Sequence, residues 1–242
     1  MINLLLFILA ALLAEIVGTV GGFGSSVFFV PLAQFFLGFK TVLGITAVFH
    51  LFSNTAKLLF FRNKIDWRVL FLIGIPAVIF VLIGSYITAS VNSEYTKLGL
   101  GIFLILFSVV FLVFKNFEIK ASNRNALLGG GISGFLAGLI GTGGAIRGAT
   151  MVAFNLDKNI FVATSAGIDL GVDFSRALVY LYNGFLDPMY YKYIPVLIAV
   201  AFAGSYLGKM LLDRIPQSVF RILVLLLLLV IGVVMVIQFW VS

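Results

Sequence analysis

One arginine stands alone inside a glycine-rich, otherwise apolar stretch whose chemistry suits an anion. The stretch is 137–148, AGLIGTGGAIRG, with five glycines and Arg147 as its only charge. Each glycine costs a helix about 1 kcal/mol relative to alanine, so the run predicts a helix break. N–H groups at the start of the helix that resumes after Gly144 lack intrahelical acceptors and, with the helix dipole, favour anions. A guanidinium there predicts contact with a small oxyanion.

Two predicted helices, 41–61 and 160–182, each carry four polar residues spaced by four, four and three positions. The first helix has Thr46, His50, Asn54 and Lys57, and the second has Ser165, Asp169, Asp173 and Arg176. Each set forms one polar stripe on an apolar helix. Ionisable groups inside a membrane are costly and usually face the bundle interior or a water-filled cavity. We expect the stripes to line a pathway, with His50, Asp169 or Asp173 as candidates to relay protons.

The elements that position these residues are membrane helices. The chain has 242 residues, is 62% hydrophobic, has a mean hydropathy of +1.20 and carries a net charge of +7. This composition excludes an ordinary soluble domain, and the positive charge in short loops indicates membrane orientation rather than nucleic-acid binding. The absence of cysteine excludes disulfides, thiolate metal sites and cysteine nucleophiles. We therefore expect an all-α polytopic membrane protein with no cofactor.

The chain repeats itself after about 120 residues. AEIVGTVGGFGSSV at 14–27 aligns without gaps on AGLIGTGGAIRGAT at 137–150, and the two polar stripes align after a small shift. Gly84-Ser85-Tyr86 recurs at 204–206. This pattern predicts a first repeat at 1–114, a polar cytoplasmic linker at 115–125 and a second repeat at 126–242. Each repeat has a glycine-broken segment and three long helices, which are 41–61, 69–89 and 97–114, then 160–182, 193–212 and 218–241.

Loop charges favour broken segments that turn back as re-entrant hairpins. If both segments crossed the membrane, the loop cations would divide seven against six. If both turn back, ten lie on one side and only Lys40, Lys97 and Lys192 on the other, as the positive-inside rule expects. The repeats are then inverted, loops 62–68 and 115–125 are cytoplasmic, and both termini lie outside. A single oblique crossing with an unwound centre is the alternative.

Breaks that enter from opposite sides would meet near the midplane, where inverted-repeat transporters bind substrate. The substrate-binding residues predicted beside Arg147 come from both breaks. They are Gly21, Gly22, Gly24, Ser25, Ser26, Thr142, Gly143 and Gly144. For the glycines the alternative is close helix packing, and for the hydroxyls it is ordinary hydrogen bonding between helices.

The charged residues also have structural alternatives. Arg147, whose place Gly24 takes in the first repeat, could neutralise Asp169 or Asp173 and hold the bundle together. Asp173 could pair with Arg176 along one helix, and Lys57 could extend toward the membrane surface near Arg62. His50 and Asn54 could simply bridge helices.

The sequence resembles the sulfite exporter TauE/SafE family of membrane permeases. The resemblance rests on GTVGGFGSSVFFVPL at 18–32, its weaker copy GTGGAIRGATMVAF at 141–154, the GITA and ATSA helix starts, and the repeated GSY. It implies a two-repeat carrier in the plasma (inner) membrane that exports sulfite or small organosulfonates. In the second repeat Phe154 replaces Pro31 and Arg147 follows the glycines, which leaves the substrate open.

We therefore predict a secondary transporter that moves a small sulfur-containing oxyanion by alternating access. Coupling to protons and assembly as a homo-oligomer are both compatible with this prediction. The alternatives are a passive anion channel and a membrane-embedded structural or sensory protein. An intramembrane enzyme is disfavoured, because one histidine and no cysteine leave few ways to build a nucleophile or a metal cluster.

Overall fold

A computed structural model describes residues 4–22, 24–61, 65–114, 119–212 and 217–241. Within these ranges every regular element is helical. The elements are α1 (Leu4–Gly21), α2 (Ser26–Ala33), α3 (Phe39–Phe60), α4 (Trp67–Ser90), α5 (Ser93–Val113), α6 (Asn123–Ile140), α7 (Gly144–Val152), α8 (Lys158–Tyr182), the 3-10 helix η1 (Pro188–Tyr193), α9 (Ile194–Leu212) and α10 (Gln217–Val241). The six long helices predicted from the sequence are α3, α4, α5, α8, α9 and α10, with bounds that differ by at most four residues.

Length and apolar composition identify several of these helices as candidate membrane spans. In the described part of the chain, five are long and apolar enough to cross a bilayer: α1, α3, α4, α5 and the continuous η1–α9 segment. The C-terminal helix adds the apolar stretch Val224–Trp240. The polar stripe of α8 lowers its hydropathy, although the helix has 25 residues. The chain is therefore an all-helical, multi-pass integral membrane protein.

The first glycine-rich stretch ends α1 and precedes α2, and the chain reverses direction there. Gly22 and Gly24 have positive φ values of 71° and 88°, which glycine adopts without steric cost. The ring of Phe7 in α1 lies 5.7 Å from the ring of Phe29 in α2 and 5.9 Å from that of Phe36, just beyond α2. The short helix α2 therefore runs back along α1.

The second glycine-rich stretch makes the same reversal between α6 and α7. Gly141, with φ of 81°, ends α6 in the left-handed conformation. A Cβ atom at Gly143 would lie 1.8 Å from the carbonyl oxygen of Ser133, and one at Gly129 would lie 2.1 Å from the hydroxyl oxygen of Thr150. Close approach to α6 at both ends of α7 thus holds the two helices together.

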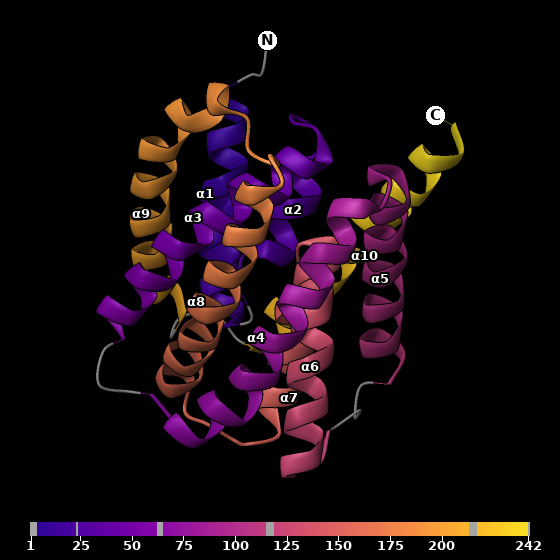
Figure 1. Cartoon of the computed structure of the whole chain (residues 1–242). Coiled ribbons are helices and arrows are strands. Elements are labelled where there is room, and N and C mark those ends of the chain that lie inside the picture. Colours follow the sequence, from indigo (N-terminus) through magenta and orange to yellow (C-terminus); the bar gives the residue numbers. More distant parts are fainter. Residues whose placement is uncertain (1–3, 23, 62–64, 115–118, 213–216, 242) are drawn as a thin grey trace.

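Helices of the first half pack mainly on helices of the second half. The largest contact is that of α4 with α6, and α1 with α9, α4 with α8 and α3 with α9 also pack extensively. When each helix is exchanged for its partner in the predicted repeat, the α4–α6 pair becomes the α9–α1 pair. The α3–α9 pair likewise becomes the α8–α4 pair. The remaining large contacts, α3 with α8 and α5 with α10, join equivalent helices. Figure 1 shows α5 beside α10 at one edge of the bundle.

Small residues let these helices approach closely. A Cβ atom at Gly84 in α4 would lie 2.2 Å from the carbonyl oxygen of Phe135 in α6. A Cβ atom at the matching Gly204 in α9 would lie 2.7 Å from the Glu15 side chain in α1. The repeated Gly-Ser-Tyr sequence therefore marks two equivalent helix contacts, each of which joins one half to the other.

We expect Gly138→Ala to destabilise the protein. A Cβ atom at this position in α6 would lie 2.3 Å from the carbonyl oxygen of Val81 and 2.5 Å from the Ser85 nitrogen, so α4 and α6 must separate. The expected loss is about 1–3 kcal/mol, measured as a lower melting temperature in detergent. Gly99→Ala is the matched control, because its Cβ would meet only Ile140 at 3.8 Å. Equal melting temperatures for the two variants would contradict the tight α4–α6 contact.

The hairpin of α1 and α2 and the hairpin of α6 and α7 extend from opposite ends of the molecule, and their turns lie between those ends. Figure 1 places α1, α2 and the end of α10 toward one end of the molecule. The starts of α4 and α6 lie toward the other end, near α7. Asp66 caps α4 and Ser122 caps α6 through side-chain hydrogen bonds. Both helices therefore begin inside the segments predicted as polar loops, 62–68 and 115–125. Residues 62–64 and 115–118 of those segments lie outside the described part of the chain.

Candidate functional site

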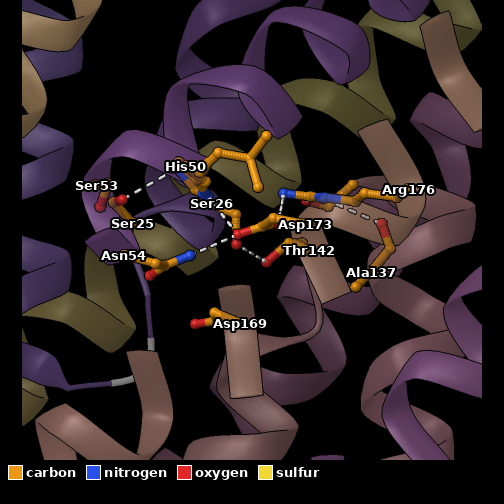
Figure 2. Close-up of polar contacts among 12 residues, drawn as sticks. Ser25, Ser26, His50, Ser53, Asn54, Ala137, Thr142, Asp169, Asp173 and Arg176 are labelled. Carbon is orange, nitrogen blue, oxygen red and sulfur yellow. Dashed lines mark hydrogen bonds and ion pairs between the residues drawn. The ribbon is translucent and has the colours of Figure 1, made fainter. Parts of the chain in front are cut away.

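The two predicted polar stripes face each other across the contact between α3 and α8. The Asn54 amide donates a 2.7 Å hydrogen bond to the Asp173 carboxylate, and His50 Nδ1 lies 3.9 Å from the same oxygen. Figure 2 shows Asn54 and Asp173 pointing toward one another, with Asp169 one turn away along α8. Seven of the eight stripe residues are buried, and Asp169 is partly exposed. The stripes therefore form one polar layer inside the bundle.

A buried carboxylate that the sequence reasoning overlooked lies at the centre of the first half. Glu15 in α1 is fully buried and pairs with the Lys57 ammonium at 2.8 Å. Four hydroxyl groups also donate hydrogen bonds to it, from Ser25 at 2.5 Å, Ser53 at 2.6 Å, Ser205 at 2.8 Å and Thr19 at 3.3 Å. Glu15 thereby ties α1 to the first break, to α3 and to α9.

The position of Lys57 excludes its proposed extension toward the membrane surface. Its side chain is 5% exposed and also donates a 2.8 Å hydrogen bond to Ser53. Ser25, just before α2, contacts both the Glu15 carboxylate and His50 Nε2, the latter at 3.0 Å. The lysine and the first break are thus joined through Glu15 and Ser25.

Arg147 lies in the first turn of α7 and pairs with Asp169. Its two terminal nitrogens bind the two carboxylate oxygens of Asp169, and Nε and Nη2 donate to the Ser165 hydroxyl at 3.3 and 3.2 Å. This two-pronged geometry is how guanidinium groups bind planar oxyanions. The pair that sequence reasoning kept as the structural alternative for Arg147 is therefore present.

The two breaks touch each other at this point. Ser26 at the start of α2 donates a long hydrogen bond, 3.4 Å, to Thr142 in the second break. A Cβ atom at Gly24 would lie 3.2 Å from Asp169 Oδ2 and 3.4 Å from Arg147 Nη2. Glycine at position 24 therefore lets the first break lie directly against the Arg147–Asp169 pair.

The other predicted glycines differ in their surroundings. Gly22 lines the same region and lies against the ring of Phe161, whereas Gly21 is the last residue of α1. Gly143 is the residue before α7 and Gly144 is its first residue, and the tight approach of Gly143 to Ser133 gives Gly143 a packing role.

Arg176 binds the C-terminal end of α6 through hydrogen bonds to its carbonyl oxygens. It pairs with Asp173 at 2.6 Å and donates hydrogen bonds to the carbonyl oxygens of Ala137 at 3.2 Å and Gly141 at 2.6 Å. Tyr180 adds a 2.5 Å hydrogen bond to the Gly138 carbonyl. These contacts satisfy carbonyls that the helix end leaves open. Arg176 therefore binds the backbone of the second break, whereas Glu15, paired with Lys57, binds Ser25 in the first break.

A small pocket opens beside these ion pairs. It is lined by Gly18, Thr19, Gly22, Gly24, Asn54, Lys57, Val162, Ser165, Ala166 and Asp169. The lining joins the first break to both polar stripes, and it includes one member of each of two ion pairs, Lys57 and Asp169. The described residues contain no cluster of His, Cys, Asp or Glu that could hold a metal ion. The donors and cations present suit an anionic ligand.

A helical membrane bundle in which two broken helices meet beside buried ion pairs is typical of a membrane transporter. Comparison with known proteins also indicates a membrane transporter. The chain belongs to the sulfite exporter TauE/SafE family, whose model matches residues 7–235. It is also 26% identical over 225 residues to a protein of Methanocaldococcus jannaschii described as a "probable membrane transporter protein", covering 85% of this chain and 84% of that protein. The protein is thus a membrane transporter by family.

Proposed function

We propose that the protein is a secondary transporter that exports small sulfur-containing oxyanions, such as sulfite or organosulfonates, by alternating access of its two halves. The observation that carries this proposal is the position of Arg147. Its guanidinium lies in the first turn of α7, against the backbone of the first break, and is held in a carboxylate-binding geometry. The family description supplies the sulfur oxyanion, and the site chemistry supports an oxyanion in general.

Both half-helices contribute to the attraction for an anion. The first N–H groups of α2 and α7 have no acceptors within their own helices, and the dipoles place partial positive charge at these ends. The contact between Ser26 and Thr142 brings the two helix starts together. Lys57 adds a cation that lines the adjacent pocket. An oxyanion held here would contact both halves of the protein.

An inverted repeat with re-entrant hairpins fits this proposal. Three observations support it: the reversals at α1–α2 and α6–α7, the extension of these two hairpins from opposite ends of the molecule, and the exchange of helix pairs between the halves. Rocking one half against the other would then expose the meeting point of the breaks to each side in turn. The loop charges favour an orientation with 62–68 and 115–125 in the cytoplasm and both termini outside.

Transport is tested by counterflow in proteoliposomes. Vesicles are loaded with unlabelled sulfoacetate, and the uptake of labelled sulfite or sulfoacetate is compared with uptake by protein-free vesicles. A carrier gives a transient accumulation of label that depends on the internal substrate, whereas a passive channel only equilibrates the label. Acetate and phosphate serve as competing anions for selectivity. The absence of protein-dependent flux for either sulfur anion would contradict the proposed function.

A further inference from the structure

The guanidinium that we assign to substrate already holds an oxyanion supplied by the chain. Asp169 occupies both terminal nitrogens of Arg147, and Ser165 receives hydrogen bonds from Nε and Nη2. Five donors fixed in one plane leave little room for a second bidentate partner. A substrate oxyanion and the Asp169 carboxylate therefore compete for the same face of Arg147.

We propose that Asp169 is a tethered competitor that leaves Arg147 when the anion binds and takes up a proton as it does so. This inference rests on the proposed transport function and adds a proton as the coupled ion. The carboxylate that loses its guanidinium would stand as an isolated charge inside the bundle. Such a charge is costly, and adding a proton from water removes it without breaking any covalent bond.

The location of Asp169 suits this exchange better than that of Asp173. The Asp169 side chain is 14% exposed and lines the pocket, so water can reach it. Asp173 is 3% exposed and remains bound to Arg176 and Asn54. Arg176 is anchored in turn to the α6 carbonyls, and an arriving anion does not release Asp173 from it.

The other charged groups around the site remain paired when Asp169 is released. Glu15 keeps Lys57, and Asp173 keeps Arg176. The charged and titratable groups of this polar layer are Glu15 on α1, His50 and Lys57 on α3, Arg147 on α7, and Asp169, Asp173 and Arg176 on α8. The bound anion takes the place of Asp169 on the guanidinium, and the proton neutralises the carboxylate that Arg147 releases. Each bound anion would carry one proton with it.

Proton uptake can be measured directly in the purified wild-type protein. Sulfoacetate is titrated by calorimetry at one pH in two buffers of different ionisation enthalpy, neither of which is a sulfonate or a phosphate. We expect close to one proton to be taken up per anion bound. By linkage, binding should also tighten as the pH falls, because protons favour the anion-bound state. Binding without proton uptake would overturn the tethered competitor and leave the proposed function intact.

Asp169→Asn provides the second test, because it keeps the shape of the side chain and removes its charge. We expect sulfoacetate to bind about tenfold or more tightly, since the competing state is lost, with no proton uptake. Asp173→Asn is the matched control on the same helix and should not tighten binding, because it leaves the Arg147–Asp169 pair in place. Weaker binding by Asp169→Asn, or retained proton uptake, would refute the inference. If neither wild type nor Asp169→Asn binds sulfoacetate or sulfite, the proposed function fails as well.

Discussion

Replacing Arg147 by Gln is expected to abolish sulfite and sulfoacetate counterflow, with a loss on the order of 100-fold, because the anion loses its two-pronged donor. Arg147→Lys keeps the positive charge without the planar fork and should retain a small part of the flux. The measurement is the initial rate of labelled-anion counterflow, normalised to the amount of protein recovered as a single species in detergent.

A double variant separates a substrate role for Arg147 from a structural one. Arg147→Gln alone leaves Asp169 without its partner, which destabilises the bundle for reasons unrelated to transport. Arg147→Gln combined with Asp169→Asn removes both charges and should recover much of the melting temperature. We expect this double variant to remain inactive. Recovery of transport together with stability would show that Arg147 serves only to neutralise Asp169.

Replacing Glu15 by Gln is expected to be among the most damaging changes to stability. The amide cannot neutralise the buried Lys57, and its NH2 group would face side chains that now donate to the carboxylate. Breaking a buried ion pair in this way costs about 3–5 kcal/mol. For a chain of this size that corresponds to a melting-temperature drop on the order of 10 °C.

The exposed pair between Glu94 and Lys97 supplies the control for Glu15. Its atoms lie 2.7 Å apart, but the side chains are 48% and 34% exposed, so Glu94→Gln should cost less than about 1 kcal/mol. A Glu15→Gln variant as stable as Glu94→Gln would contradict the role of Glu15 in joining α1, α3 and α9. Transport by Glu15→Gln should also fall, since Ser25 before α2 loses its acceptor.

Hydropathy and glycine content were sufficient to predict the helices and their two interruptions. Long apolar runs leave little choice of structure in a bilayer, because backbone groups must be satisfied within the helix. The spacing of the polar residues in α3 and α8 likewise placed each set on one face, and those faces meet. The order of the repeats and their orientation in the membrane stay predictions, supported by how the helices pair.

The sequence reasoning missed Glu15 because it weighted residues that recur in both halves. The aligned position in the second half is Gly138, so duplication gave Glu15 no support. A local signal was nevertheless present, since Glu15 is the only acidic residue before Asp66 and lies in an apolar run. An ionisable residue in such a run is by itself a reason to expect a buried partner.

The pairing of the charged residues depends on packing that spacing does not specify. Asp169 and Asp173 lie on the same face of α8, and only the approach of α7 decides that Arg147 meets Asp169. Arg176 reaches the α6 carbonyls because α6 ends at Gly141, beside α8. Helix periodicity gives the face on which a residue lies, whereas contacts between helices determine its partner.

Anion-dependent stabilisation of the purified protein tests the central claim most directly. The melting temperature is measured with sulfite, sulfoacetate, sulfate, phosphate and acetate, each at equal ionic strength, for the wild type and Arg147→Gln. Binding to the native state raises the melting temperature in proportion to affinity and concentration. We predict stabilisation of the wild type by sulfite or sulfoacetate above the other anions, and none for the variant. Equal responses of the two proteins, or no response to any anion, would contradict an oxyanion site at Arg147.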